Sequence, residues 1–208
     1  MLSLALISCS LLLPLVAGAA PKVNVTLYSE SLCPDCIDFI TGAWTTVWNT
    51  PGVGGVDGII EWNQVVFGNA KVSKNNATIT CQHGPEECSM NTAQACALDL
   101  YKGNASAWVP FMICLENAGS NMPSELKSCA ATNDLDFAKI DACWKGKEGF
   151  QLDLDSGIAT NALQPPHEFV PWVTLGGIPG TFCHNSNCDT FLSAVCDAYT
   201  GTKPSACP

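Results

Sequence analysis

The sequence contains few charged side chains, and basic ones are the scarcer kind. Charged residues make up 13% of the 208 residues, with 9 Lys and Arg against 19 Asp and Glu. The net charge of −10 leaves no basic patch for a polyanion, and no glycine-rich loop of the phosphate-cradling type is present. We therefore expect no nucleic-acid partner.

Long hydrophobic runs are absent after the N-terminal segment. No later segment approaches the ~18 apolar residues that a membrane span needs. The start, MLSLALISCSLLLPLVAGAA, has no charged side chain, an apolar middle, and Ala17 and Ala19 placed for cleavage. We interpret residues 1–19 as a secretory signal peptide and 20–208 as one mature domain, with an uncleaved anchor as the alternative. After cleavage we expect no membrane span.

Cysteine, by contrast, is abundant. Of the 13 cysteines, Cys9 would leave with the signal peptide, and an even number would remain. In an oxidising compartment such a density is typical of a disulfide framework. Asn24, Asn76 and Asn104 begin N-x-S/T sequons, which predict glycosylation, although Asn24 lies beside an expected strand. We expect the secretory pathway, ending outside the cell or in a lysosome or vacuole.

The segments that flank a cysteine-rich middle are rich in strand-forming residues. Alternation predicts a strand over 23–29, helical spacing predicts a helix after CPDC, and DGIIEWNQVVFG predicts a second strand. This β-α-β start favours parallel pairing with a right-handed crossover. Towards the end of the chain, LDSGIATNALQ indicates a helix. The segment FVPWVTLGGIPG indicates a strand, a proline, a second strand and a turn. The segment CDTFLSAVCDAYTG indicates an amphipathic helix with Asp189 near its start and Gly201 after it.

The middle of the chain, about 81–150, holds six cysteines and has helical character. Gly84, Pro85 and two glutamates form a good helix start, because proline suits the first turn and acids complement the helix dipole. DLDFAKIDACWKG predicts a short helix that ends at Gly146. We expect a helical insertion stapled by disulfides.

Cys33 and Cys36 lie two residues apart where the first strand gives way to the first helix. Only a thiolate attacks a disulfide, and a helix start lowers a cysteine pKa because its free N–H groups favour the anion. Pro34 fits the first helical position. We predict that Cys33, at the exposed edge, is the nucleophile and that Cys36, nearer the core, is the resolving cysteine.

Asp35 lies inside this pair, and its carboxylate is expected to raise the pKa of Cys33, less so in acid, where it is partly protonated. The alternatives to a redox pair are a structural bridge and a zinc site. Zinc would need a second cysteine pair or histidines at ligand spacing, whereas His83, His167 and His184 are scattered. We expect no metal.

Pro171 interrupts a β-rich run, although proline cannot donate to a sheet ladder. It is either an edge-strand residue or part of a cis Val170–Pro171 bond. In thioredoxin-like proteins such a cis-proline faces the active pair, and the strand, C-x-x-C and helix upstream favour that interpretation. We predict that Val170 and Pro171 position the substrate.

Residues 81–96, CQHGPEECSMNTAQAC, resemble the signature C-Q-H-G-x-x-E-C-x-x-N-x-x-x-x-C of the gamma-interferon-inducible lysosomal thiol reductase family. Every fixed position matches, namely Cys81, Gln82, His83, Gly84, Glu87, Cys88, Asn91 and Cys96. The segments YSESLCPDC, VFGNAK and HEFVPWV are also similar to the family, so the resemblance covers about 25–200.

The resemblance implies an α/β fold, a thioredoxin-like sheet with flanking helices and a disulfide-rich helical insertion. It implies a thiol:disulfide oxidoreductase that reduces disulfide-containing protein substrates, often at acidic pH, with no bound prosthetic group. By position, Cys33 and Cys36 correspond to the redox pair, and Val170–Pro171 to the substrate-side turn. A small-molecule thiol, cysteine or glutathione, is the expected reductant, since nothing in the sequence indicates a nicotinamide or flavin site.

The signature segment itself is expected to be structural. Cys81, Cys88 and Cys96 would staple a helix start, and Gly84 and Asn91 would fix turns and caps. An acid–base role for the signature histidine is the alternative. Ten cysteines are left for structural bridges of unknown pairing, with Cys183–Cys188 as a local guess; they are Cys81, Cys88, Cys96, Cys114, Cys129, Cys143, Cys183, Cys188, Cys196 and Cys207.

Two other functions stay open at this level. A saposin-like secreted binding protein would explain the cysteine-rich helices but neither the β-rich flanks nor Pro171. A thiol oxidase or isomerase would share the fold and differ in redox potential.

Overall fold

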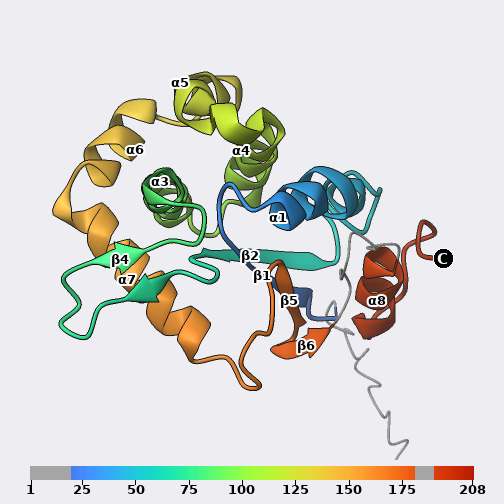
Figure 1. The fold of residues 1–208 in the computed structure, drawn as a ribbon. Helices are drawn as coiled ribbons and strands as arrows, with labels where there is room; N and C mark the ends of the chain where they lie inside the picture. Colours follow the sequence, from blue (N-terminus) through green and yellow to red (C-terminus); the bar gives the residue numbers. More distant parts are fainter. Residues whose placement is uncertain (1–19, 181–189) are drawn as a thin grey trace, which may run out of the picture.

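The computed structural model describes residues 20–180 and 190–208. Its centre is a four-stranded sheet in the order β2-β1-β5-β6 (Figure 1). The strands are β1 (Val23–Ser29), β2 (Ile60–Val66), β5 (Trp172–Leu175) and β6 (Ile178–Gly180). A separate small sheet pairs β3 (Lys71–Val72) with β4 (Ile79–Thr80). The expected signal peptide lies outside the described residues.

Strand β1 is the central element that positions the rest. It pairs in parallel with β2, from Val23 opposite Ile60 to Ser29 opposite Val66, and antiparallel with β5. Its bounds and its parallel partner confirm the predictions from sequence. The strand expected before Pro171 is wrong, because 168–171 form bends and β5 begins only at Trp172. A proline cannot supply a ladder N–H, so the strand starts after it.

The helical run after the cysteine pair follows the predicted apolar spacing but is not uniform. It consists of α1 (Pro34–Phe39), a π-helical stretch (Ile40–Trp44) and α2 (Thr45–Trp48). In the π-helical stretch the Thr45 hydroxyl donates to the Ile40 carbonyl over 2.6 Å. This carbonyl lies where the backbone hydrogen bonds change from the α-helical to the π-helical pattern.

The middle of the chain is helical, as predicted. Its helices are α3 (Pro85–Leu100), α4 (Ala105–Ala118), a 3₁₀ turn (Gly119–Asn121), α5 (Met122–Thr132), α6 (Phe137–Trp144) and α7 (Lys147–Asn161). The helix expected over LDSGIATNALQ is confirmed for residues 154–161, where it forms the second half of α7, which begins at Lys147. Gly146 precedes α7 with an extended backbone, so the break falls there. The last helix is α8 (Phe191–Ala198).

Four disulfides tie neighbouring elements together in the described part of the chain. They are Cys81–Cys88, Cys96–Cys143, Cys114–Cys129 and Cys196–Cys207. The expectation that Cys96 helps to staple the start of α3 is therefore wrong. Cys96 lies three turns into α3, and its sulfur faces α6 instead. The guessed Cys183–Cys188 pair lies outside the described residues.

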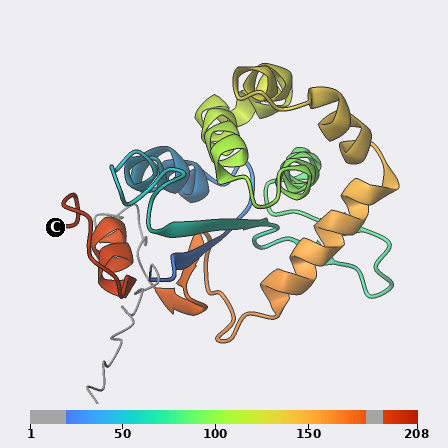
Figure 2. The same ribbon diagram turned by 180° about the vertical axis from the view of Figure 1, so that it is seen from behind.

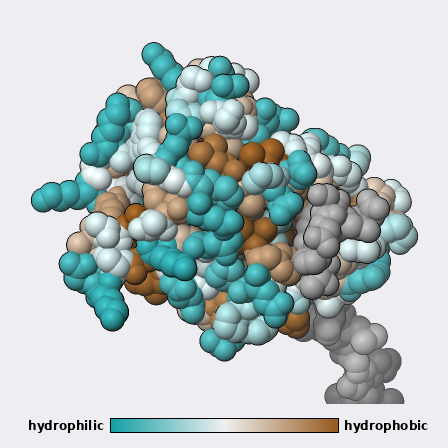
Figure 3. Space-filling model, viewed as in Figure 1, coloured by the Kyte–Doolittle hydropathy of each residue, from teal (hydrophilic) through white to brown (hydrophobic). Residues whose placement is uncertain are grey.

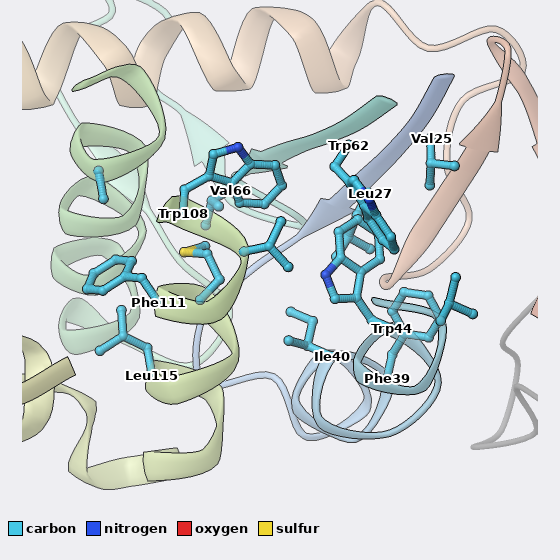
Figure 4. Packing of buried hydrophobic residues seen from close by; sticks show 14 of the residues in the cluster. Val25, Leu27, Phe39, Ile40, Trp44, Trp62, Val66, Trp108, Phe111 and Leu115 are labelled. Carbon is cyan, nitrogen blue, oxygen red and sulfur yellow. The ribbon is translucent and has the colours of Figure 1, made fainter. Parts of the chain in front are cut away.

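The core lies between the sheet and the helices that cover it. In Figures 1 and 2, α1 and α4 lie above the sheet and α7 crosses below it. Figure 4 shows Trp44 and Phe39 of the first helical run packed against Leu27 and Trp62 of the sheet. The Trp44 and Trp62 rings lie 4.4 Å apart, centroid to centroid, in an edge-to-face arrangement. This packing fixes the helix that carries the cysteine pair against β1.

The surface carries no extended apolar face on the side seen in Figure 3, where hydrophobic residues form separate areas bordered by hydrophilic ones. The exposed large hydrophobic residues are Val56, Leu100, Phe150, Ile158 and Ile178. None of the helices within 20–180 and 190–208 has the length and apolar content to cross a membrane.

A carboxyl group is buried in the interior where α3 and α4 meet. Glu116 of α4 is 1% exposed, and Gln94 of α3 donates its amide to Glu116 Oε1 over 3.1 Å. Burial raises the pKa of Glu116 to about 8, while the hydrogen bond from Gln94 lowers it and the charge of Cys33 raises it further. Glu116 is therefore neutral in acid and becomes a buried anion in base.

This carboxyl makes stability depend on pH. Because its folded pKa is raised, its contribution to stability is complete below the unfolded value near 4.5 and is lost as pH rises through about 8. We expect Glu116→Gln, which mimics the neutral acid, to remove a loss on the order of 5 kcal/mol between acid and alkaline pH. Urea unfolding at several pH values measures this, with exposed Glu125→Gln as the control. Parallel curves for the parent and Glu116→Gln would contradict it.

Candidate active site

The two cysteines that do not form a bridge within the described chain are Cys33 and Cys36. Cys33 is the N-cap of α1, and its sulfur accepts a hydrogen bond from the Cys36 N–H over 3.4 Å. Pro34 occupies the first turn, as predicted. Cys36 is fully buried and Cys33 is 6% exposed, so their order from core to surface is the predicted one.

The prediction that Cys33 lies at an exposed edge is nevertheless wrong, because Cys33 is buried. Cys33, Cys36 and Val170 pack together as a small buried cluster, so Val170 covers the pair. The Val170–Pro171 peptide bond is cis, as the sequence predicts, and so is Gln164–Pro165, which it does not. The chain segment just before β5 therefore lies directly against the two sulfurs.

The two thiols differ in acidity. The pKa of Cys33 is lowered, chiefly by its hydrogen bond with Cys36, although burial opposes this; the backbone N–H groups of Cys36 and Asp35 also lower it. Burial raises the pKa of Cys36 well above the usual range, and the hydrogen bond to Cys33 and the charge of Cys33 raise it further. Cys33 is therefore the more acidic thiol and Cys36 holds its proton.

The carboxylate that opposes the Cys33 thiolate is not the one expected. Asp35 is exposed, and its contribution comes from the backbone N–H, which lowers the pKa of Cys33. Glu30, three residues before Cys33, exerts the opposing charge instead. The Glu30 side chain is fully buried, so its charge is weakly screened by water.

The loop before Cys33 is held by the signature helix. Asn91 of α3 places its Oδ1 against Ser31, where it accepts the Ser31 N–H over 2.8 Å and the Ser31 hydroxyl over 2.7 Å. The same hydroxyl lies 3.0 Å from the Glu87 carbonyl oxygen. The next residue, Leu32, has a φ of 62°, a left-handed conformation that costs a branched side chain about 1–3 kcal/mol. Asn91 therefore fixes a turn, as expected, and that turn is Ser31–Leu32, the strained approach to Cys33.

His83 and Glu87 of the signature also reach this loop. Glu87 accepts the N–H groups of Gln82 and His83, each over 3.0 Å, which holds the turn onto the start of α3. The His83 ring Nδ1 contacts Glu87 Oε2 and lies 3.6 Å from Glu30 Oε1. Three titratable side chains from two segments thus meet behind Cys33.

A third segment completes this cluster. The Asn69 N–H donates to Glu30 Oε2 over 2.6 Å, and the Asn69 side-chain amide donates to Gln82 over 2.7 Å. Asn69 follows β2, and Gly68 before it has a φ of 58°. A Cβ at Gly68 would lie 2.2 Å from Glu30, so this turn needs glycine to approach the carboxyl.

Glu30, His83 and Glu87 are also the described residues whose ligand atoms lie close enough for a metal, within 4.8 Å of one another. Most of the carboxylate oxygens among these ligand atoms are already engaged, however. Both Glu87 oxygens accept backbone N–H groups, and one Glu30 oxygen accepts the Asn69 N–H. We interpret this group as a hydrogen-bonded proton-sharing cluster.

Two surface cavities flank the sheet. One, of about 580 Å³, is lined by Asn69, Lys71, Gln82 and His167 among others, so it adjoins the cluster. The other, of about 340 Å³, lies between β2, α3 and α7, and neither free cysteine lines it. Neither Cys33 nor Cys36 lines the first cavity either, so its link to the site is through Asn69 and Gln82 of the cluster.

The predicted glycosylation sites are all at the surface. Asn76 lies in the turn between β3 and β4, Asn104 directly precedes α4, and Asn24 is exposed on β1. Nothing in the structure tests their modification, which stays a prediction.

Sequence reasoning did not assign Glu30, Ser31, Asn69 or Glu116 to the site. A signal for three of them was present, because Glu30 and Ser31 belong to YSESLCPDC and Asn69 to VFGNAK. These segments and the signature looked like separate matches. The fold brings them together around one carboxyl group.

A free dithiol at the first helix of a mixed sheet, opposite a cis-proline, is the arrangement of thiol:disulfide oxidoreductases with a thioredoxin-like fold. Solved structures agree on this fold. DsbG from Mycobacterium tuberculosis superposes with a TM-score of 0.59 at 19% identity, covering 96% of this chain and 88% of that one. DsbA from Chlamydia trachomatis superposes with a TM-score of 0.55 at 12% identity, covering 92% of this chain and 95% of that one.

The sequence comparisons place the chain more narrowly. The family model for gamma interferon inducible lysosomal thiol reductase (GILT) matches residues 24–133. A gamma-interferon-responsive lysosomal thiol protein of Arabidopsis thaliana is 37% identical over 93% of this chain and 78% of its own length. The gamma-interferon-inducible lysosomal thiol reductase of Mus musculus is 34% identical over 90% of this chain and 73% of its own length. This protein belongs to the GILT family.

The anchor between Asn91 and Ser31 is testable by truncation. Asn91→Ala leaves the buried Ser31 N–H without its acceptor, which costs about 1–3 kcal/mol in the free energy of unfolding. We also expect slower alkylation of Cys33, because Leu32 is no longer held in its strained conformation. Asn117→Ala, which removes an exposed amide of α4, is the matched control and should change neither quantity. Equal stability of the two variants would contradict the role of Asn91.

Proposed function

We propose that this protein is a thiol reductase that opens disulfide bonds in protein substrates through Cys33 and Cys36. The observation that carries the proposal is the pair itself, with two unbridged thiols of unequal acidity at the start of α1, covered by Val170. The remaining described cysteines of the mature chain form four bridges. We assign substrate positioning to Val170, which packs against the pair, and to Pro171, to which Val170 is joined by a cis bond.

The first step is attack on the substrate. The Cys33 thiolate attacks one sulfur of the substrate disulfide, and the other sulfur leaves as a thiolate that takes up a proton. A mixed disulfide between Cys33 and the substrate results. Cys33 suits this step because its pKa is the lower of the two.

The second step releases the reduced substrate. Cys36 loses its proton, attacks Cys33 Sγ and displaces the second substrate sulfur, which leaves the Cys33–Cys36 disulfide. Two electrons have then passed from the pair to the substrate. We propose that a small thiol, cysteine or glutathione, returns them, with two thiol molecules oxidised to one disulfide. No prosthetic group is needed for this cycle.

An oxidase or isomerase on the same fold is the main alternative. A strongly oxidising pair requires a reduced form that is stabilised by a very low thiol pKa. Here burial and the Glu30 charge oppose the lowering of the Cys33 pKa, which favours a reductase. A redox titration against glutathione separates the two, since an oxidase pair would have the higher potential.

The saposin-like alternative has less support. The helical middle of the chain packs against the sheet, with α3 and α7 both on β2, and does not stand alone as a helical domain. The relatives are named as thiol reductases, and several of their names include the word lysosomal. We propose a secretory route to a lysosome, vacuole or the exterior, for which the bridges and the surface position of the sequons are the support.

The two cysteines should fail in different ways when substituted. Cys33→Ser removes the nucleophile, so we expect reduction of an insulin disulfide to fall to the background rate of the small thiol. Cys36→Ser blocks release, so the mixed disulfide with substrate should accumulate and be visible by non-reducing electrophoresis. The double variant Cys114→Ala/Cys129→Ala removes a bridge elsewhere and should keep the activity. Full activity in Cys33→Ser would sink the proposal.

A further inference from the structure

Glu30 is a carboxyl group that the thiol-exchange cycle does not use. It lies three residues before Cys33, its side chain is fully buried, and one of its oxygens has no hydrogen-bond donor among the described residues. Burying a carboxyl in this way costs free energy unless its environment compensates. Its position next to the redox pair therefore calls for a role.

The surroundings of Glu30 hold it in place on both sides. Asn69 fixes one oxygen through a 2.6 Å hydrogen bond, and the His83 ring lies 3.6 Å from the other. His83 is itself oriented by Glu87, whose two oxygens also bind the backbone at Gln82 and His83. His83 is 29% exposed at its side chain, so protons can reach the cluster from solvent.

We propose that Glu30 and His83 are positioning residues for the redox reaction that form a charge switch behind Cys33. When both carry their protons, the neutral acid and the imidazolium cation favour the Cys33 thiolate. When both have lost their protons, the carboxylate and the neutral imidazole disfavour it. This inference rests on the proposed function, because it requires Cys33 to act as a thiolate.

The protonation states support this direction. Burial raises the pKa of Glu30 to about 7, against the hydrogen bond from Asn69, and the charge of Glu87 raises it further. Burial lowers the pKa of His83, but the hydrogen bond to Glu87 and the charges of Glu87, Glu30 and Cys33 outweigh it, so the net shift is upward. In acid the pair thus presents a cation and a neutral acid, and in base an anion and a neutral ring.

Other charged groups near Cys33 do not reproduce this switch. Cys36 of α1 keeps its proton, and Asp35 acts through its backbone N–H. Glu87 of α3 is committed to the backbone of the turn, and Glu116 of α4 ionises near pH 8. The segment around Val170 brings an apolar side chain. Glu30 and His83 are therefore the pair whose charges act on Cys33 with opposite sign.

The consequence is an unusual pH profile. The thiolate fraction of an isolated thiol falls tenfold for each pH unit below its pKa. Here the switch moves the Cys33 pKa downward as the pH falls, so the thiolate fraction should fall by less. The protein would keep a reactive Cys33 thiolate in acid. At neutral pH the same thiol would still not be fully ionised.

The test is the alkylation rate of reduced Cys33 by iodoacetamide from about pH 4.5 to about pH 9, read on the Cys33 peptide by mass spectrometry. Glu30→Gln mimics the protonated acid, so we expect no change near pH 5 and a rate about three- to tenfold higher near pH 7. His83→Gln lacks the cation, so we expect a rate about three- to tenfold lower near pH 5 that converges with the parent in base.

Two further variants separate this role from a structural one. His83→Lys restores a cation and should recover the acid rate that His83→Gln loses, and its profile should lack the histidine transition. Glu86→Gln removes an exposed acid next to Glu87 and should match the parent throughout. Variant profiles that superimpose on the parent, a loss at every pH in both Gln variants, or no recovery in His83→Lys would each overturn the inference. A parent Cys33 that is unreactive at every pH would instead overturn the proposed function.

Discussion

One side-chain oxygen determines how the reactive end of this molecule is built. Oδ1 of Asn91 accepts both the N–H and the hydroxyl of Ser31, deep between α3 and the end of β1. Without that acceptor a buried N–H would be unpaired, and the left-handed backbone at Leu32 would have nothing to hold it. The direction in which the chain enters α1, and so the place of Cys33 at its N-cap, depends on this bond.

The helical middle of the chain is therefore part of the site and not an attachment to the sheet. Its first turn supplies His83 and Glu87, its first helix supplies Asn91 and Gln94, and its second helix supplies Glu116. The rest of the chain contributes the cysteines at the start of α1 and the cis-proline segment just before β5. Each half of the fold leaves polar groups that only the other half can satisfy, which couples the packing of the helices to the chemistry of the thiols.

The sequence predicted the parts of this structure that follow from local rules. The bounds of β1, its parallel partner and the start of α3 after Gly84 all have a short-range signal, whereas the cis bond before Pro171 was favoured only because of the strand, C-x-x-C and helix upstream. The run of helices was harder, because Gly146 does follow the end of α6, as predicted, but it is also the N-cap of α7, whose start at Lys147 was not predicted.

The site could be predicted only in outline for a related reason. Cys33 and Cys36 are recognisable from spacing, whereas Glu30 gains its raised pKa from burial, and burial depends on Asn69 and His83 arriving from distant segments. Asp35 attracted attention because it is adjacent in sequence, yet its side chain is exposed. Both carboxylates lie within three residues of Cys33, so burial of the side chain, and not distance along the chain, decides which one acts on the thiol.

The bridge Cys81–Cys88 has a consequence for the working life of the protein. In each of the other described bridges at least one cysteine is buried, whereas both residues of this bridge are partly accessible. In the proposed cycle a small thiol returns the electrons to Cys33 and Cys36, and the same thiol would meet this partly accessible bridge next to the site. Opening it would remove the covalent tie across the turn that places His83 near Glu30, so in that cycle more reductant would also mean a shorter life for the assembled site.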